Sequence, residues 1–268
     1  MRKPAVSGQF YPGSERELRG LIQRLAPSPV SADREPQTKI RACGVVVPHA
    51  GYIYSGGVAA EVYASIEGAP TFLLLGPNHY GLGSPVAVST QPWVTPLGRV
   101  EVDQELVGLL NGIIDRDEIA HQQEHSLEVH IPLLQYFFED FKIVPVSIGM
   151  QDYDTVKEIA TELIAALNKH TGRVVIVASS DFTHYEDVKA ARKKDSTLID
   201  DIEKLDVPAF YDDLYRLNAT CCGYGPIAAM MITCGARGAR TGKLLKYATS
   251  GDVTGDSQVV GYAGIAVL

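Results

Sequence analysis

Short apolar runs rich in β-branched residues alternate with longer segments of helical periodicity along most of the chain. The apolar runs cover residues 41–47, 71–75, 142–148 and 173–178, and continuous hydrophobicity of this kind is typical of buried parallel strands. Apolar positions three and four residues apart predict helices over residues 55–66, 126–138, 153–169, 188–205, 208–217 and 226–236. This alternation predicts an α/β fold with a mostly parallel central sheet and helices on both faces.

The remaining segments add elements at the ends and along one side of this sheet. Ser14 and Asp103 are predicted to cap helices that end near residues 25 and 111. Residues 85–89 and 98–102 are predicted to be short strands, with a hairpin between them as one arrangement, and residues 243–249 and 258–267 two closing strands. Residues 27–39 hold three prolines without periodicity, which indicates a surface connection. Since no repeat or change in composition divides the chain, we expect residues 1–268 to form a single domain.

A histidine follows three of the apolar runs within a few residues. These histidines are His49, His79 and His184. In open α/β sheets, ligands bind beyond the carboxyl ends of the strands. Turn-forming neighbours surround each histidine, so we expect the three imidazoles to meet at this edge of the sheet. The pattern predicts a site for metal or proton chemistry, with three core histidines bonded to backbone as the alternative.

Composition limits the partners of such a site. The chain has 268 residues, of which 46% are hydrophobic and 21% charged, and a formal net charge of −8. An acidic surface disfavours nucleic acid and anionic membranes as partners, because both require clustered lysine and arginine. The sequence shows neither a membrane span nor the apolar segment of a signal peptide. Four cysteines are too few for a disulfide scaffold in a chain of this length, so we expect a cytoplasmic protein.

Residues 124–130 (EHSLEVH) concentrate acids and histidines. On a helix, His125 and Glu128 would share one face. The pattern approaches the H-x-x-E-H motif of a zinc-protease class, but one additional residue between the acid and the second histidine spoils that geometry. We expect His125 to face the site and to contact substrate or orient a ligand. The other isolated histidines are expected to be structural or superficial: His130 structural, and His121 and His170 on the surface.

Two further kinds of side chain could complete the site. Asp181 precedes His184 by three residues, so its carboxylate could orient the imidazole, bind metal or cap the segment that follows. Cys221 and Cys222 precede a predicted helix, and a cysteine near a helix amino terminus has a depressed pKa. Vicinal cysteines rarely ligate one metal together. We therefore expect one of them to face the site and the other the core, and the sequence leaves open which, and whether the thiol is reactive.

Tyrosines recur beside these elements. Tyr52 and Tyr54 follow His49, Tyr80 follows His79, and Tyr224 follows the cysteine pair. Together they would give a binding site aromatic walls and phenolic hydrogen bonds, which suit a planar or phenolic small molecule. Packing in the core is the alternative for some of them.

Several motifs, in their order along the chain, resemble those of the Memo family. They are RKPAVSGQFYP (residues 2–12), PHAGYIYSG (48–56), GPNH (76–79), EHSLEVH (124–130), SSDFTH (179–184) and CG (222–223). The resemblance extends over essentially the whole chain, which looks like a prokaryotic, archaeal member. The family's fold is similar to that of class III, LigB-type extradiol dioxygenases, non-haem iron enzymes that open catechol rings. The resemblance therefore implies a single Memo-like, LigB-like α/β domain.

The resemblance also implies roles for individual residues. His49 and His79 match the two metal-ligand histidines, and His184 matches the acid–base histidine of the dioxygenases. Cys222 stands where those enzymes place a ligand glutamate, and Asp181 matches an aspartate of the family's pocket. Because a thiolate makes the site softer, copper or zinc can compete with iron, and ring cleavage is not expected.

Two main functions follow. In the first, a metal-dependent redox enzyme holds iron or copper on His49, His79 and Cys222, and His184 moves protons. In the second, a binding protein retains the dioxygenase-like pocket without turnover and recognises a small molecule, a metal or a peptide. Metal-assisted hydrolysis with zinc is a third interpretation. Peptide binding by eukaryotic relatives does not transfer by resemblance alone, and the sequence leaves open whether the protein forms a homo-oligomer.

Overall fold

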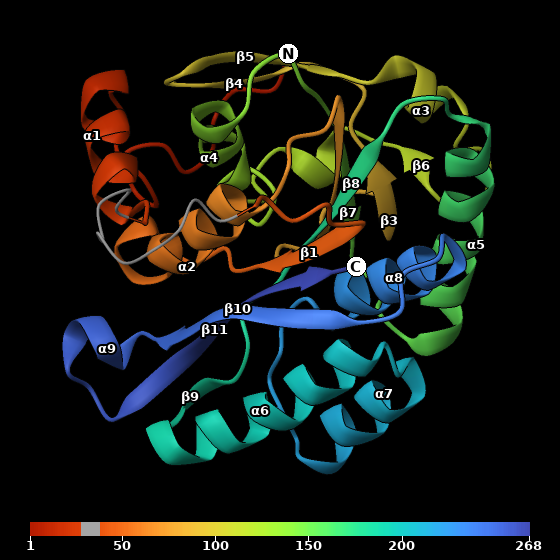
Figure 1. Ribbon diagram of the computed structural model, residues 1–268. Coiled ribbons are helices and arrows are strands. Elements are labelled where there is room, and N and C mark those ends of the chain that lie inside the picture. The colour runs from red at the N-terminus through yellow and green to blue at the C-terminus, as the bar shows by residue number, and fades with distance from the viewer. Residues whose placement is uncertain (28–37) are drawn as a thin grey trace.

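Four apolar strands run parallel at the centre of the fold, as Figure 1 shows for the computed structural model, which describes residues 1–27 and 38–268. Their order across the sheet is β1 (Gly44–Val47), β8 (Val174–Ser179), β2 (Thr71–Pro77) and β7 (Lys142–Ile148). Nearly every residue of these strands is buried. Burial on both faces explains why the four segments are continuous apolar runs. Most of the surface connection predicted at residues 27–39 lies outside the described residues.

Further strands extend this parallel centre on both sides. On one side, β11 (Gln258–Val267) pairs antiparallel with β1, β10 (Gly242–Thr249) and β9 (His184–Asp187). On the other side, β3 (Val86–Val88) pairs antiparallel with β7 and parallel with β6 (Asp115–Arg116). The predicted α/β architecture and its parallel centre are confirmed, and the whole sheet is mixed because both flanks add antiparallel strands.

The hairpin beside the sheet differs from the expected one. β5 (Gly98–Val102) pairs antiparallel with β4 (Trp93–Thr95), and β3 pairs with β6 and β7 instead. Gly98 closes the tight turn between the two strands with a φ of 121°, which a residue with a Cβ rarely adopts. The expected pairing of residues 85–89 with residues 98–102 is therefore wrong. β4 escapes prediction because it has only three residues and follows a proline.

Helices cover both faces of the sheet (Figure 1). One face carries helices that pack on one another: α1 (Glu15–Leu25), α2 (Tyr52–Ser65) and α4 (His130–Phe137). The other face carries a second group: α5 (Tyr153–Lys169), α6 (Val188–Lys204), α7 (Val207–Arg216) and α8 (Tyr224–Ala236). Short helical segments complete the described elements: α3 (Gln104–Gly108), α9 (Gly251–Thr254) and a 3₁₀ turn at Ile119–His121.

The helix predicted to begin at residue 126 begins instead at His130, and the residues between them form turns. Pro132 lacks an amide N–H and fits best in the first turn of a helix, so the helix starts shortly before it. His125 therefore stands in a loop. It shares no helical face with Glu128, contrary to the expectation from their spacing.

The two ends of the parallel strands lie next to different parts of the molecule. The C-terminus lies beside the start of β1, because Val267 pairs with Gly44. The carboxyl ends of β1, β2 and β8 lie at the other end of the parallel strands, away from the C-terminus.

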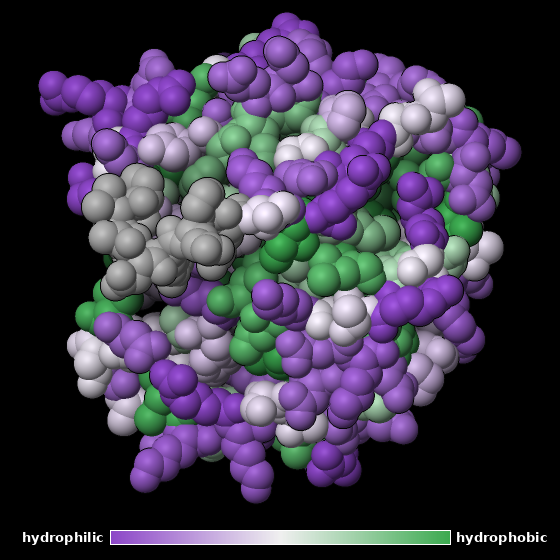
Figure 2. Space-filling model, in the orientation of Figure 1, coloured by the Kyte–Doolittle hydropathy of each residue, from purple (hydrophilic) through white to green (hydrophobic). Residues whose placement is uncertain are grey.

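On the face seen in Figure 2, a mostly hydrophilic surface surrounds a smaller hydrophobic patch. Within the described ranges, no helix has both the length and the apolar character needed to cross a membrane.

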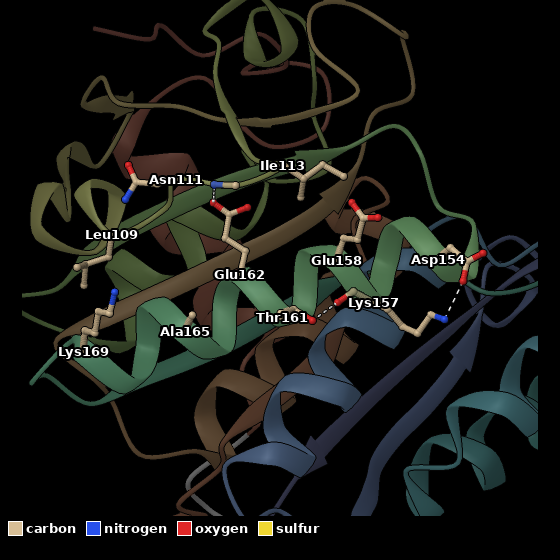
Figure 3. A pocket seen from close by; sticks show the side chains of 11 residues that line it. Leu109, Asn111, Ile113, Asp154, Lys157, Glu158, Thr161, Glu162, Ala165 and Lys169 are labelled. Atoms are coloured by element: carbon tan, nitrogen blue, oxygen red, sulfur yellow. Dashed lines mark hydrogen bonds and ion pairs between the residues drawn. The ribbon is translucent and has the colours of Figure 1, made fainter.

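A surface groove of about 890 Å³ lies between residues 109–113 and α5 (Figure 3). Among its charged side chains, Asp154 pairs with Lys157 at 2.7 Å, and Glu162 contacts the loop. Glu162 accepts hydrogen bonds from the backbone N–H groups of Gly112 at 2.7 Å and Ile114 at 3.1 Å. Because these contacts fasten the loop to α5, we assign this groove a structural role.

Candidate metal centre

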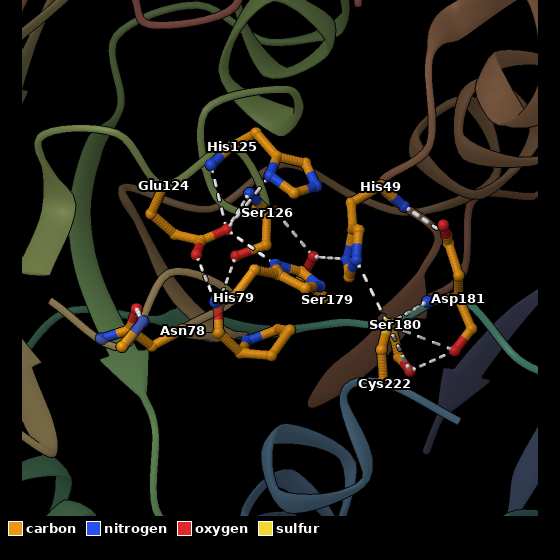
Figure 4. A network of polar contacts seen from close by, with 12 residues as sticks. His49, Asn78, His79, Glu124, His125, Ser126, Ser179, Ser180, Asp181 and Cys222 are labelled. Atoms are coloured by element: carbon orange, nitrogen blue, oxygen red, sulfur yellow. Dashed lines mark hydrogen bonds and ion pairs between the residues drawn. The ribbon is translucent and has the colours of Figure 1, made fainter. Parts of the chain in front are cut away.

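Three imidazoles meet beyond the carboxyl ends of the parallel strands (Figure 4). His49 follows β1 and His79 follows β2, and their ring centroids lie 5.1 Å apart. His125 joins them from the loop before α4, with its ring centroid 4.6 Å from that of His79 and 5.6 Å from that of His49. One ring nitrogen of each residue lies within 4.8 Å of the other two. The third imidazole of this cluster thus comes from His125 and not from His184.

Asp181 and His184 follow β8, and Asp181 contacts the cluster directly. The Oδ1 atom of Asp181 accepts the backbone N–H of His49 at 2.8 Å. Burial raises the pKa of Asp181 to about 6, and that hydrogen bond opposes the rise only in part. The Nδ1 atom of His184 lies 2.9 Å from the carbonyl oxygen of Thr220. Since a carbonyl only accepts, Nδ1 carries the proton of the neutral ring and Nε2 is free to accept another.

Glu124 organises the loop that carries His125, although sequence alone did not single it out. Its buried carboxylate accepts hydrogen bonds from His79 Nδ1 at 2.9 Å and from the backbone N–H groups of His79, His125 and Ser126. Burial alone would raise the pKa of Glu124, but these hydrogen bonds and the adjacent imidazole hold it at about 2. Because the carboxylate only accepts, His79 Nδ1 must be protonated, and Nε2 of the neutral ring keeps its lone pair.

His125 has a ring nitrogen without a partner. The ring stacks on His79 and packs against Phe10 of the amino-terminal segment, with centroids 4.7 Å apart. Among the described residues, its Nδ1 has no hydrogen-bond partner, and a Glu124 carboxylate oxygen lies 3.4 Å away. Burial lowers the pKa of His125 to about 4, so the ring is neutral at physiological pH. A neutral ring with one nitrogen within 4.8 Å of those of two other imidazoles can serve as a metal ligand.

Cys222 is the cysteine that faces the histidines. Its Sγ lies 3.3 Å from His49 Nε2, whereas the Sγ of Cys221 lies 3.1 Å from the hydroxyl of Ser180. Burial raises the pKa of Cys222 well above its usual range, and the charge of Asp181 adds to this effect. The depressed pKa expected near a helix amino terminus is therefore not found. Without a metal Cys222 is a thiol, and metal binding would release its proton.

The four tyrosines expected to line the site lie in different surroundings. Tyr52 is buried and donates its hydroxyl to a backbone carbonyl at 2.6 Å, which is a packing role. Tyr54 and Tyr80 are 39% and 50% exposed, and the ring of Tyr80 lies edge-on to His125 at 6.3 Å. Tyr224 packs against another tyrosine at 5.9 Å. Of the four, Tyr80 contacts the imidazole cluster.

The remaining histidines are buried or paired. His130 is buried, as expected for a structural residue. The prediction that His121 lies on the surface is wrong: the residue is fully buried, its Nε2 donates to a backbone carbonyl at 3.1 Å, and its ring packs on Trp93. The side chain of His170 is also buried and pairs with Asp103 at 3.2 Å. The partners of His121 and His170 come from segments far away in the sequence. The residues next to each histidine therefore do not predict its burial.

The lowered pKa of the buried His121 predicts that the protein loses stability in acid. Burial lowers the pKa of His121 to about 4, below the value of 6.5 for an unperturbed histidine. Between these values the unfolded chain binds more protons, so stability is lost as the pH falls through this window, by up to about 1.4 kcal/mol per pH unit. Asp181, with its raised pKa, shifts stability in the opposite sense. The wild type is therefore compared with His121→Gln by urea titrations at several pH values. As the pH falls, the unfolding free energy should decline more steeply in the wild type, and parallel declines would contradict this.

A buried ion pair fastens the amino-terminal segment to the site loop. Glu128 accepts hydrogen bonds from the Arg2 guanidinium, from the Tyr11 hydroxyl at 2.6 Å and from two backbone N–H groups. Arg2 also donates to the carbonyl oxygens of His121 at 2.9 Å and Glu124 at 2.7 Å. Glu128, the acid expected to share a helical face with His125, therefore has a structural role. It holds in place the loop that supplies the third imidazole.

These residues fit a transition-metal ion. Three imidazoles within 4.8 Å of one another and a thiol 3.3 Å from one of them form a nitrogen and sulfur donor set, which suits copper, zinc or iron. His125 adds a ring nitrogen within 4.8 Å of those of the other two histidines. The hydrogen bond from His79 to Glu124 is of the kind that orients metal-ligating histidines.

The chain has similar relatives over its full length. A family model described as Memo-like protein matches residues 2–266. MEMO1 family proteins of Methanosarcina acetivorans, Archaeoglobus fulgidus and Nitrosopumilus maritimus are 54%, 49% and 43% identical to it. The alignments cover 100%, 99% and 100% of this chain and 99%, 98% and 100% of those proteins. The resemblance of the sequence motifs is confirmed, and the chain belongs to the Memo family.

Proposed function

We propose that this protein is a metal-dependent redox protein that binds non-haem iron or copper through His49, His79 and Cys222. The observation that carries the proposal is the meeting of three imidazoles and a thiol at the carboxyl edge of the parallel strands. His125 offers a further nitrogen to the same centre. The family's similarity to class III extradiol dioxygenases supports a LigB-like domain and a small-molecule ligand at this edge. A thiol in place of the third, carboxylate ligand argues against catechol ring cleavage.

A bound iron or copper ion would supply one-electron redox chemistry and a Lewis acid for an oxygen-containing ligand. The side chains around it would handle protons. Asp181 can take up or release a proton near neutral pH, because burial raises its pKa to about 6. His184 can accept a proton on Nε2 while Thr220 holds its Nδ1. Tyr80, half exposed beside the cluster, offers an aromatic surface to the ligand.

Oxygen uptake distinguishes a redox protein from one that only binds. Protein loaded anaerobically with Fe(II) or Cu(I) should consume oxygen with ascorbate as reductant, faster than the free metal does. Asp181→Asn and His184→Gln should retain the metal and slow oxygen uptake by about 10²–10⁴-fold, the usual contribution of general acid–base catalysis. Stoichiometric metal binding without oxygen uptake would identify a non-catalytic binding protein instead.

Glu124→Gln tests the support behind His79. The amide cannot accept all the hydrogen bonds that the carboxylate accepts, so the His79 ring should lose its fixed orientation. We expect metal affinity to fall by about 10–100-fold, as for other partners of metal-ligating histidines. Glu118→Gln is the matched control, because the Glu118 carboxylate likewise accepts hydrogen bonds from Ser89 and Thr90 but lies outside the cluster. Equal affinities for both variants would show that Glu124 does not support the site.

A further inference from the structure

We propose that Ser179 is a positioning residue that determines which ring nitrogen of His49 is available to a metal ion. The inference rests on the proposed metal-binding function and concerns the metal-free protein itself. Ser179 is the last residue of β8, and its side chain is completely buried. In Figure 4 its hydroxyl lies beside the imidazole of His49, on the side away from Cys222.

The Ser179 hydroxyl makes three close contacts. Its Oγ lies 2.7 Å from the carbonyl oxygen of Ser126, 2.7 Å from His49 Nδ1 and 2.8 Å from His130 Nε2. A hydroxyl has a single hydrogen to donate and two lone pairs that accept. All three of these hydrogen-bonding positions are therefore used, one for each contact.

The directions of these three hydrogen bonds follow from the chemistry of their partners. A carbonyl oxygen only accepts, so the hydroxyl hydrogen of Ser179 must point to Ser126. The oxygen of Ser179 can then only accept from the two imidazoles, and both facing nitrogens must carry hydrogen. His49 is thereby fixed with its proton on Nδ1. Its Nε2 keeps a lone pair, which points toward Cys222 Sγ at 3.3 Å.

The far end of the network is consistent with this assignment. If the neutral His130 ring carries its proton on Nε2, then its Nδ1 must accept. The buried hydroxyl of Tyr63 lies 3.0 Å from His130 Nδ1 and can donate to it. One chain of hydrogen bonds thus connects Tyr63, His130, Ser179 and Ser126, and each donor in it has one acceptor. Its effect at the site is to direct the His49 Nε2 lone pair toward Cys222.

Ser179→Ala would remove the oxygen that accepts the hydrogen bond from His49 Nδ1. His49 could then place its proton on either nitrogen, and the form with hydrogen on Nε2 cannot ligate a metal on the Cys222 side. Ser147→Ala is the matched control. Ser147 is a buried serine of the nearby strand β7, and its hydroxyl has no hydrogen-bond partner among the described residues.

The experiment is ¹⁵N NMR of the metal-free protein with labelled histidines, since the ring nitrogen shifts distinguish protonated from unprotonated nitrogens. His49 signals are identified by their loss in His49→Gln. In the wild type and Ser147→Ala, His49 should carry hydrogen on Nδ1 alone, and Ser179→Ala should show a mixture of both forms. Zn(II), a probe without redox chemistry, should bind Ser179→Ala about 10–100-fold more weakly, with Ser147→Ala unchanged.

The outcomes separate the positioning role from metal binding. Hydrogen on His49 Nε2 in the wild type would overturn the proposal, and this spectrum decides the matter even if Ser179→Ala does not fold. An unchanged His49 form and unchanged zinc affinity in Ser179→Ala would also overturn it. If the wild type shows the expected form and binds no metal, the proposed function fails while the hydrogen-bond order stands.

Discussion

Glu128→Ala is expected to lose about 3–5 kcal/mol of unfolding free energy, the usual cost of removing one partner of a buried ion pair. The side chains of Arg2 and Glu128 are only 6% and 1% exposed. The variant would leave the Arg2 guanidinium buried without its carboxylate and the Tyr11 hydroxyl without its acceptor. Since domains are typically stable by about 5–15 kcal/mol, this loss is a large fraction of the total. Urea unfolding measures it directly.

An exposed ion pair provides the control for this variant. Arg99 and Glu101 form a salt bridge with side chains 56% and 53% exposed, and pairs of this kind contribute little in water. Glu101→Ala should therefore leave the urea midpoint unchanged. If Glu128→Ala unfolds at the same urea concentration as the wild type, the buried pair does not hold the amino-terminal segment on the site loop.

Cys222→Ala is expected to lose bound metal, while Cys221→Ala retains it. The sulfur of Cys222 faces His49 Nε2 at 3.3 Å, and that of Cys221 faces the Ser180 hydroxyl. Removing a direct ligand should cost more than the roughly 10–100-fold typical of an outer hydrogen-bonding partner. Competition with a chromophoric chelator, performed without oxygen, measures both affinities.

The two cysteine variants are matched, because each removes one sulfur at adjacent positions of the same turn. A general disturbance of this turn would lower the affinity of both variants equally. Retention of the metal by Cys222→Ala, or an equal loss in both, would contradict the assignment of Cys222 as a ligand.

The parallel centre and the positions of His49 and His79 could be predicted from the sequence. Strands buried on both faces have continuous apolar sequences, and parallel neighbours end at one edge, so residues that follow β1 and β2 must lie near each other. A local signal in the sequence also marks the start of α4. Pro132 belongs in the first turn, and this local rule outweighs the apolar periodicity that extends back to residue 126.

The rest of the site depends on contacts between distant segments. Glu124 meets His79 across 45 residues of sequence, and Ser179 meets His49 across 130. Glu124 belongs to the EHSLEVH motif, but the local pattern does not show that its carboxylate accepts from His79. A serine at the end of an apolar run looks like an ordinary strand end. The burial of His121 could not be predicted for the same reason, because Arg2 and Trp93, which cover it, come from elsewhere in the chain.

The metal content of the wild-type protein, purified without oxygen, tests the proposed centre most directly. We expect stoichiometric iron or copper after loading, with X-ray absorption showing both nitrogen and sulfur ligands and the sulfur signal lost in Cys222→Ala. If the wild type holds no stoichiometric metal under any loading condition, the cluster of His49, His79, His125 and Cys222 is not a metal centre.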